Sequence, residues 1–386
     1  MRDRFSLLEG FALKVVNVIT GLGRGGAEGA LFRLCVESPA AVRMVVVSLT
    51  DHGVHGEFLQ RAGVEVVALE IRSPLSAPWA LLRLWRMLIK DRPDVVQTWM
   101  YHSDLLGGIA ARIAGVPVCW GIRQANLSRG IKRSTKFVAK ICGWLSKIVP
   151  AHAISCSERA VQAHRQYGYR VSMTVVPNGY DLSRWQSPEL APTSRSAFGL
   201  AESDLVLAHA ARAHPQKDHA NLALAFSKAY RQDPRLKLLL CGTGLEDGSP
   251  YLQALPFTAE ARLAVRAVGP RDDLPQLWHM ADAFVLSSAS EGFPNVVAEA
   301  MASGLPAIVT DVGDAALIVA DTGIVVPPNN PAALAAAMLR MADLPKEERR
   351  GLGQAAAARV AENYTVDRMV DGFMRVWQGV LSRKNA

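Results

Sequence analysis

The sequence predicts an α/β protein with two doubly wound parallel sheets, because short apolar strands alternate with helical patterns along its length. Half of the 386 residues are hydrophobic, which is enough apolar surface for two ordinary domains with separate cores. Alternating strands and helices favour parallel sheets that are covered by helices on both faces. A polar, proline-containing stretch near the middle of the chain divides the series into two halves.

The first half contains apolar runs of strand length, separated by turns and helical patterns. The expected strands are residues 15–19, 44–49, 64–69, 95–98, 116–120, 153–155 and 174–176. The stretch 184–203 is the expected linker, so the first domain covers 1–183 and the second covers 204–364. Further strands are expected at residues 205–208, 238–241, 283–286, 307–309 and 324–326, followed by an alanine-rich helical region at 331–361.

The segment 290–301 combines a loop, a helix start and two carboxylates. Glu291 lies in the loop and Glu299 lies on the helix, with seven residues between them. Pro294 suits the first helical position, and Gly304 ends the helix. Such a strand, loop and helix direct backbone N–H groups and the positive end of the helix dipole at one point, where an anion binds. The two glutamates can hold hydroxyl groups on either side of that anion, which describes a nucleotide sugar.

Other loops of the second domain add positive charge and close backbone approach. Arg212 and Lys217 lie on the loop after strand 205–208, where two cations can neutralise a diphosphate leaving group. Gly242 and the pair Gly269-Pro270 follow other strands of this domain. Because ligands bind beyond the carboxyl ends of such strands, we expect these loops to border one crevice.

Two segments of the first domain are also candidates for ligand contact. His102 lies where strand 95–98 gives way to a helix. The loop 21–26 follows the first strand and satisfies G-x-G-x-x-G, which alone also fits the pyrophosphate of a dinucleotide, with Asp51 as a ribose-binding acid. A tight turn that needs positive φ explains the glycines equally well.

Together these motifs resemble the retaining glycosyltransferases of family 4, which share the two-lobed GT-B fold. The resemblance rests on Ser-x-x-Glu-Gly-Phe-Pro-Asn, Glu-Ala-Met-Ala-x-Gly-x-Pro and the later segment 310–313, in the family's order. It implies two Rossmann-like domains facing a central cleft, and a last helix within 365–386 that returns to the first domain. The implied catalytic residues are Glu291, Arg212, Lys217 and His102. The implied donor-binding residues are Glu299, Gly25, Gly26, Gly292, Phe293, Pro294, Asn295, Gly242, Gly269 and Pro270.

The resemblance also implies a reaction. The leaving diphosphate, held by Arg212 and Lys217, helps to deprotonate the incoming hydroxyl on the same face of the sugar, while Glu291 holds the sugar and Glu299 the ribose. The expected acceptor is a lipid-linked glycan of surface polysaccharide or lipopolysaccharide biosynthesis. Two rival functions stay open: a dinucleotide-binding oxidoreductase that uses the loop 21–26, and a non-catalytic nucleotide-sugar sensor.

Two positions depart from the family pattern. Many relatives carry histidine where this chain has Trp99, and Pro-Glu where it has 314–316, so contacts from the latter loop are not carried over. Asp272-Asp273 is a poor metal-binding D-x-D because Arg271 precedes it. We therefore expect no obligatory metal and no other cofactor.

Composition narrows the location and the partners. The five cysteines are scattered without a C-x-x-C pair, which indicates reduced thiols in a cytoplasmic protein and neither disulfides nor a zinc site. No uncharged apolar run approaches about 18 residues, so we expect no membrane-spanning helix. The formal charge of +8 favours anionic partners, but no nucleic-acid-binding module is recognised.

Residues 131–148 predict an amphipathic, basic helix. Its apolar stripe is Phe137, Ile141, Trp144 and Ile148, and its cations are Lys132, Arg133, Lys136, Lys140 and Lys147. Such a helix can rest on anionic lipid at the inner face of the cytoplasmic membrane, and the alternative is a core-facing helix with solvated lysines. A second basic helix, with Trp79, Leu82, Trp85 and Ile89, makes the membrane contact the favoured interpretation.

Overall fold

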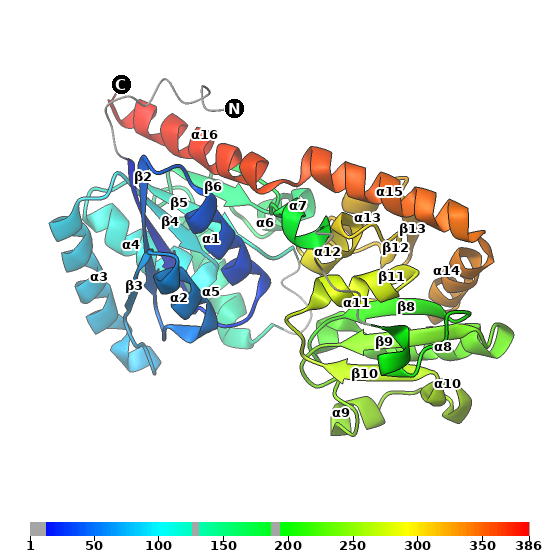
Figure 1. Cartoon of the computed structure of the whole chain (residues 1–386). Coiled ribbons are helices and arrows are strands. Elements are labelled where there is room, and N and C mark those ends of the chain that lie inside the picture. The colour runs from blue at the N-terminus through cyan, green and yellow to red at the C-terminus, as the bar shows by residue number, and fades with distance from the viewer. Residues whose placement is uncertain (1–12, 126–130, 187–193, 386) are drawn as a thin grey trace. The chain divides into compact units, whose positions relative to one another are not determined.

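The computed structural model describes residues 13–125, 131–186 and 194–385. The chain divides into two compact units, one made of Met1–Gly179 with Val366–Ala386 and the other of Tyr180–Thr365. Each unit is a doubly wound α/β domain, so the predicted fold class is confirmed, and each is described on its own (Figure 1). The predicted linker, 184–203, groups with the second unit, although its residues 187–193 lie outside the described ranges.

The first unit is built on a seven-stranded parallel sheet in the order β3-β2-β1-β4-β5-β6-β7. The strands are β1 (Leu13–Ile19), β2 (Val42–Ser48), β3 (Glu65–Ala68), β4 (Val95–Trp99), β5 (Val118–Ile122), β6 (His152–Ser155) and β7 (Met173–Val175). β4 and β5 are buried throughout, as strands covered on both faces must be. The strand order reverses between β1 and β4, which is where doubly wound sheets bind ligands.

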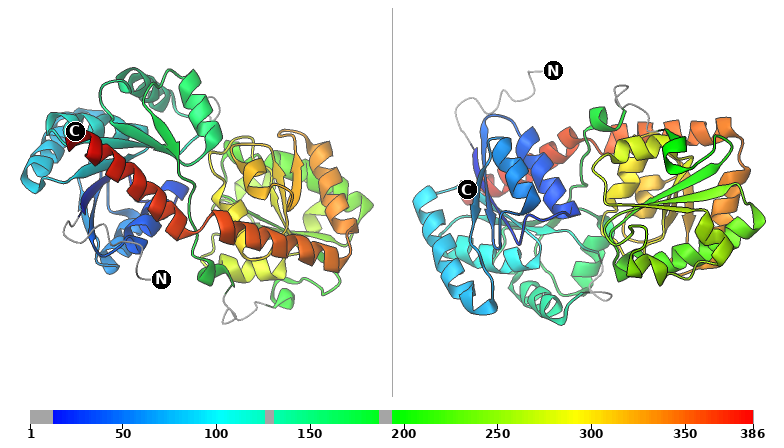
Figure 2. Two further views of the ribbon diagram at one scale, coloured as in Figure 1. Left: turned by 90° about the horizontal axis from the view of Figure 1, so that it is seen from above. Right: turned by 60° about the horizontal axis from the view of Figure 1, so that its bottom comes forward.

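Helices cover both faces of this sheet. On one face lie α1 (Gly26–Glu37), α2 (Gly53–Arg61) and α16 (Val366–Asn385), and on the other lie α3 (Ala77–Asp91), α4 (Tyr101–Ile113) and α5 (Arg133–Leu145). The short helices η1 (Pro74–Ser76) and α6 (Glu158–Gln166) complete the unit. Figures 1 and 2 show α16, in red, lying along α1, in blue. Trp377 of α16 is buried and donates from Nε1 to Gln97 Oε1 of β4 at 3.1 Å, which ties the C-terminal helix to the first sheet.

The second unit is built on a six-stranded parallel sheet in the order β10-β9-β8-β11-β12-β13. The strands are β8 (Leu205–Ala210), β9 (Leu236–Cys241), β10 (Val265–Gly269), β11 (Ala283–Leu286), β12 (Ala307–Thr310) and β13 (Gly323–Val326). Of β10 only the end was predicted, because Arg266 interrupts its apolar run. The order reverses between β8 and β11, so the loops after these two strands flank the second unit's expected binding point.

Helices of the second unit follow its strands in order. They are α7 (Leu182–Gln186), η2 (Arg195–Phe198), η3 (Pro215–Lys217), α8 (His219–Gln232), α9 (Pro250–Gln253), α10 (Ala259–Leu263), α11 (Leu274–Met280), α12 (Asn295–Ala302), α13 (Ala315–Val319), α14 (Pro331–Asp343) and α15 (Lys346–Asn363). α12 packs against α15 where a Cβ on Gly353 would lie 1.9 Å from the Gly304 carbonyl oxygen, so only glycine allows this approach. α12 begins one residue later than predicted, with Pro294 as its N-cap.

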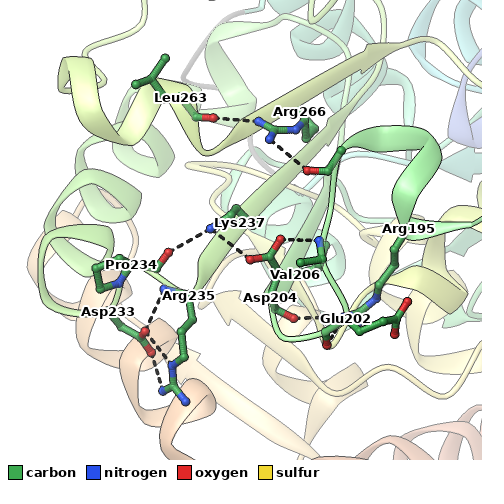
Figure 3. Close-up of polar contacts among 12 residues, drawn as sticks. Arg195, Glu202, Asp204, Val206, Asp233, Pro234, Arg235, Lys237, Leu263 and Arg266 are labelled. Carbon is green, nitrogen blue, oxygen red and sulfur yellow. Dashed lines mark hydrogen bonds and ion pairs between the residues drawn. The ribbon is translucent and has the colours of Figure 1, made fainter.

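Polar contacts hold the amino-terminal edge of the second sheet (Figure 3). Asp204, just before β8, pairs with Lys237 of β9 at 3.3 Å. Arg266 of β10 donates to the Leu263 carbonyl oxygen at 2.8 Å. These contacts fix the ends of neighbouring strands, and they leave the opposite, carboxyl-terminal edge to the loops that carry the predicted site.

Candidate active site

Three loops converge at the carboxyl ends of β8, β9 and β10. Gly242 has φ +137, and a Cβ there would lie 2.0 Å from the Ala211 carbonyl oxygen, so the β9 loop lies directly against the β8 loop. The Gly242 N–H donates to the carbonyl oxygen of Gly269, which ends β10, at 2.8 Å. Ala213 N donates to the Thr243 carbonyl oxygen at 2.7 Å. The predicted crevice edge is therefore assembled from backbone atoms, with glycine where a side chain would not fit.

The predicted cation and acid meet at this edge. Lys217 Nζ lies 2.6 Å from Glu291 Oε1, although the two residues are 74 positions apart in the chain. Ser288 Oγ donates to the same Glu291 oxygen at 2.7 Å. Ser287 Oγ donates to the Lys217 carbonyl oxygen at 2.9 Å. The loops after β8 and β11 are thus bonded to each other, as expected at the point where the strand order reverses.

Two buried histidines lie beneath the Lys217 loop. His209 of β8 bonds through Nδ1 to the Val285 carbonyl oxygen at 2.8 Å, and His219 of α8 bonds through Nδ1 to Tyr251 Oη at 3.1 Å. Burial lowers the pKa of His209 to about 4 and that of His219 to about 2, and the Lys217 charge adds to both effects. Both rings are therefore neutral at pH 7, and the positive charge of this loop resides on Lys217 and the exposed Arg212.

The start of α12 forms the other side of the site. Gly292 is buried, and its carbonyl oxygen accepts from Asp314 N at 3.0 Å. Gly313 has φ +52, and a Cβ there would lie 2.3 Å from the same oxygen. The loop that departs from the family pattern is therefore packed against the Gly292 backbone. The N-cap residue of α12, Pro294, makes no side-chain capping hydrogen bond, so the backbone N–H groups of the first turn suit an anion. Glu299 lies half-buried farther along the helix.

The predicted residues of the first unit lie at the ends of β1 and β4, which are adjacent strands. Gly25 is the N-cap of α1 and Gly26 is its first residue. His102 is half-buried in the first turn of α4, and burial lowers the pKa of its imidazole. Met100, the N-cap of α4, has φ +72, a conformation that costs free energy for any residue except glycine. The strained turn sets the direction in which α4 leaves the sheet.

Trp99 has a structural role that accounts for its departure from the family pattern. Its indole Nε1 donates to Asn17 Oδ1 at 3.1 Å, and its ring stacks on Phe373 of α16 at 5.7 Å. The Arg123 guanidinium lies 4.2 Å above the same ring. Trp99 is therefore part of the core that joins the first sheet to the C-terminal helix.

One of the two acidic residues after β10, Asp273, is paired with an arginine. Arg271 donates from Nε and Nη2 to the two carboxylate oxygens of Asp273, at 2.8 and 2.6 Å, and this pairing lowers the pKa of Asp273. Within residues 13–125, 131–186 and 194–385 no cluster of three acidic, histidine or cysteine side chains could hold a metal ion. All five cysteines are buried thiols.

A cavity of about 740 Å³ lies at the opposite, amino-terminal edge of the second sheet. Its lining includes Arg195, Asp282 and Arg349. Asp282 pairs with Arg195 at 3.0 Å and with Arg349 at 3.9 Å, so its carboxylate offsets only part of the arginines' positive charge. Because it lies away from the strand ends that carry Lys217 and Glu291, we do not assign the active site to this cavity.

Most of the predicted apolar stripe faces solvent, although α5 ends at Leu145, before Ile148, and Ile141 is half-buried. Phe137, Trp144 and Ile148 are 66%, 78% and 63% exposed, whereas the buried residues of α5 are Ala139, Cys142 and Gly143. Phe137 and Trp144 therefore do not pack into the core, although the opposite side of α5 does. Trp79 of α3 is exposed too, although Trp85 packs into the core. Across the described part of the chain, no helix is both long and apolar enough to span a bilayer.

Comparison with known proteins decides the family. Residues 24–184 match the family described as Glycosyltransferase Family 4, and residues 204–343 match that described as Glycosyl transferases group 1. A D-inositol 3-phosphate glycosyltransferase of Segniliparus rotundus is 30% identical over 309 residues, which are 75% of this chain and 67% of that protein. The chain belongs to the group 1 glycosyltransferases of family 4.

Two further comparisons concern a second sequence relative and a solved structure. The UDP-Gal:alpha-D-GlcNAc-diphosphoundecaprenol alpha-1,3-galactosyltransferase of Escherichia coli is 29% identical over 248 residues, which are 60% of this chain and 62% of that protein. The crystal structure of Anabaena HepE in complex with UDP and glucose superposes with a TM-score of 0.82 at 20% identity, covering 95% of this chain and 100% of that one. This likeness shows a GT-B-like fold.

The family assignment settles the broad function. The protein is a glycosyltransferase, and the oxidoreductase alternative is not favoured, because the loop 21–26 leads into the segment that matches the family from residue 24. Sequence reasoning included Ser288 as the first residue of the motif Ser-x-x-Glu-Gly-Phe-Pro-Asn but gave it no role, whereas in the structure its hydroxyl donates to Glu291. Sequence reasoning missed Tyr180, whose hydroxyl donates to Asn295 Oδ1 at 2.6 Å, because no local pattern links residues 115 positions apart.

Proposed function

We propose that this glycosyltransferase moves a sugar from a nucleotide sugar to a hydroxyl of a lipid-linked glycan acceptor, with retention of anomeric configuration and without a metal ion. The observation that carries the proposal is the contact of Lys217 with Glu291 at 2.6 Å, beside Arg212 on the same loop. The contact joins a phosphate-binding cation to a sugar-binding acid at the strand ends where donors bind in this fold class. The UDP and glucose bound in HepE support such a donor.

The proposed chemistry needs no group from outside the protein and its substrates. The bond between the anomeric carbon and the diphosphate oxygen breaks, and the departing electron pair stays on the diphosphate. Arg212 and Lys217 neutralise this growing charge. The acceptor oxygen bonds to the anomeric carbon on the same face, and its proton passes to an oxygen of the leaving diphosphate. His102 would contact the donor sugar.

Glu291 is better suited to hold a sugar hydroxyl than to attack the sugar. Its Oε1 is bonded by Lys217 and by Ser288, and both contacts reduce the nucleophilicity of a carboxylate. Glu299, on the following helix, would bind the ribose diol. The backbone N–H groups at the start of α12 would face the diphosphate.

The acceptor proposal rests on relatives and on the surface of the first unit. The Escherichia coli relative acts, by its name, on a sugar linked to diphosphoundecaprenol. A membrane-bound acceptor requires an enzyme that reaches the bilayer surface. The exposed stripe on α5, flanked by Lys132, Arg133, Lys140 and Lys147, supports peripheral contact with anionic lipid at the inner face of the cytoplasmic membrane. A role in surface polysaccharide or lipopolysaccharide biosynthesis follows from this acceptor.

The proposal is tested in two steps. UDP-, GDP- and ADP-sugars are first screened for the rise in Tm that a bound ligand produces. The stabilising donor is then incubated with a short-chain polyprenyl-diphosphate-linked sugar, and the anomeric proton of the product is observed by NMR. Transfer with the donor's anomeric configuration is expected. Product of inverted configuration would overturn the retaining assignment, and transfer only to soluble sugars would overturn the acceptor.

A further inference from the structure

The two chain segments that connect the units are bonded to each other inside the second unit. The chain enters this unit at Tyr180 and leaves it at Thr365. Tyr180 N donates to the Tyr364 carbonyl oxygen at 2.8 Å, and Tyr180 pairs with Thr365 in a parallel bridge. The entry and exit segments are therefore paired through their backbones at this point.

The entry segment contacts the loop 291–295, which we call the donor loop, through a hydrogen bond. Tyr180 is fully buried, and its hydroxyl donates to Asn295 Oδ1 at 2.6 Å. Asn295 is the first residue of α12, immediately after the loop that carries Glu291. The donated bond fixes which side of the Asn295 amide is the acceptor, and so fixes the orientation of the side chain.

The exit segment contacts the same loop through the aromatic ring of Tyr364. Phe293 and Tyr364 pack edge to face, with ring centroids 5.6 Å apart and planes at 67°. Both rings are buried. An edge-to-face pair constrains the direction of each ring as well as its distance. Two residues of the donor loop are thus held by tyrosines of the connecting segments: Asn295 by Tyr180 and Phe293 by Tyr364.

We infer that Tyr180 and Tyr364 are positioning residues for glycosyl transfer, which act through Asn295 and Phe293 to hold the loop 291–295 against the donor sugar. The inference rests on the proposed function. Reacting groups must be held close to their productive geometry, and small displacements of the supporting residues lower the rate steeply. Tyr180 is the first residue of the second unit and Tyr364 the last but one, so both contacts with the loop come from the ends of this unit.

The test compares variants that remove one contact each. Tyr180→Phe deletes the hydroxyl, Asn295→Ala deletes its acceptor, and the double variant closes a thermodynamic cycle. The matched control is Tyr169→Phe in the first unit, where the buried hydroxyl donates to the Ala139 carbonyl oxygen at 3.1 Å. Turnover is measured as release of the nucleoside diphosphate in the presence of the polyprenyl-diphosphate-linked acceptor. The donor is the nucleotide sugar that raises the Tm of the wild type most.

We expect Tyr180→Phe to lower kcat by about three- to tenfold, the value of one buried hydrogen bond, with little change in KM for the donor. The double variant should be no slower than the slower single variant. Tyr169→Phe should lower the Tm by about as much as Tyr180→Phe does, because each variant loses one buried hydrogen bond, but it should leave kcat unchanged. Tyr364→Leu should also lower kcat, whereas Tyr364→Phe, which keeps the ring, should retain it.

The outcomes separate this inference from the proposed function. If the wild type releases diphosphate and Tyr180→Phe matches it in kcat, the tyrosine is structural only and the inference is overturned. Additive losses in the double variant would equally contradict an action through Asn295. If the wild type itself releases no diphosphate from any UDP-, GDP- or ADP-sugar, the proposed function fails, and the inference fails with it.

Discussion

Opposite charges in direct contact make Lys217 and Glu291 the residues on which the proposed chemistry depends most. Their side chains are mostly buried, so the interaction is screened less by solvent than a surface pair. In the proposed mechanism, Lys217 would add positive charge beside the leaving group, and Glu291 would accept a hydrogen bond from a sugar hydroxyl.

Replacing either partner should therefore stop transfer and leave the fold intact. We expect Lys217→Met and Glu291→Gln each to lower kcat by about 10²- to 10³-fold, the cost of removing one group that stabilises developing charge. The control is Lys237→Met, which breaks the ion pair with Asp204 at the opposite edge of the same sheet. Initial rates of diphosphate release measure the effect. Near wild-type rates in the Lys217 variant would remove it from the active site.

Replacing Glu299 should change nucleotide affinity and not the chemical step, because its side chain would bind the ribose and not the reacting atoms. Glu299→Ala should weaken binding of the free nucleoside diphosphate by about 1–3 kcal/mol if a buried hydrogen bond to the ribose is lost. Isothermal titration with the diphosphate of the selected donor measures this change. An unchanged dissociation constant would make Glu299 an ordinary helix residue.

Asp104 makes a prediction about pH. Burial raises the pKa of this carboxyl from 3.8 to about 8, against the opposing effects of hydrogen bonds from Thr98 Oγ1 and Gly121 N. The folded protein therefore keeps a proton that the unfolded chain releases near pH 4. The stability that Asp104 contributes through this proton should be lost as pH rises from about 4 to 8, whereas Asp104→Asn cannot titrate.

The difference in unfolding free energy between Asp104→Asn and the wild type should grow by about 1.4 kcal/mol per pH unit across this window. Urea denaturation at several pH values between 5 and 8 measures it. A difference that stays constant with pH would mean that Asp104 is ionised in the folded protein.

At the scale of elements, strands were easier to predict than the contacts they bring about. Uninterrupted valine and leucine runs indicated most strands, and Gly304, with φ +82, ended α12 where the sequence placed its end. Arg266 obscured β10 because a charged residue breaks the apolar pattern. The contact of Lys217 with Glu291 could not be derived from either loop alone, since it depends on strands β8 and β11 being neighbours.

The helix α5 shows a second limit of sequence patterns. Helical spacing of Phe137, Ile141, Trp144 and Ile148 predicts one apolar stripe, but it does not say which side of the helix meets the sheet. The small residues Ala139, Cys142 and Gly143 allow close packing on the other side, and these are the ones that the structure buries. An apolar stripe thereby remains on the surface beside several lysines.

Reversing two charges, at Lys140 on α5 and at Lys147 just after it, should release the protein from anionic vesicles. We expect Lys140→Glu with Lys147→Glu to weaken binding to vesicles that contain phosphatidylglycerol, because each cation near the surface contributes about 1 kcal/mol. The control, Lys228→Glu with Arg231→Glu on α8, makes the same change in net charge on the second unit. Co-sedimentation at low salt measures binding. Equal loss in both variants would show that net charge alone is responsible, and failure of the wild type to bind would contradict the membrane proposal.

At the scale of the whole molecule, the chain folds into two units and passes from one to the other twice. The sequence predicted two doubly wound domains from the repeated alternation of strands and helices, and the C-terminal helix α16 packs on the first sheet as the resemblance implied. Arg123 binds both connecting parts of the first unit, since it donates to Asn178 Oδ1 at 3.0 Å and lies 5.4 Å from the Phe373 ring. No local pattern could indicate this arginine, because its partners lie far away in the sequence.

The central claim is that the loops of the second unit catalyse metal-free transfer of a sugar from a nucleotide. Its most direct test is diphosphate release from the nucleotide sugar selected by Tm, measured in excess EDTA for the wild type and for Lys217→Met. Because two cationic side chains would supply the charge that a metal ion supplies elsewhere, the wild type should keep its full rate in EDTA, and Lys217→Met should be nearly inactive. A wild type that is inactive in EDTA and restored by magnesium or manganese, or a Lys217→Met variant as fast as the wild type, would contradict the claim.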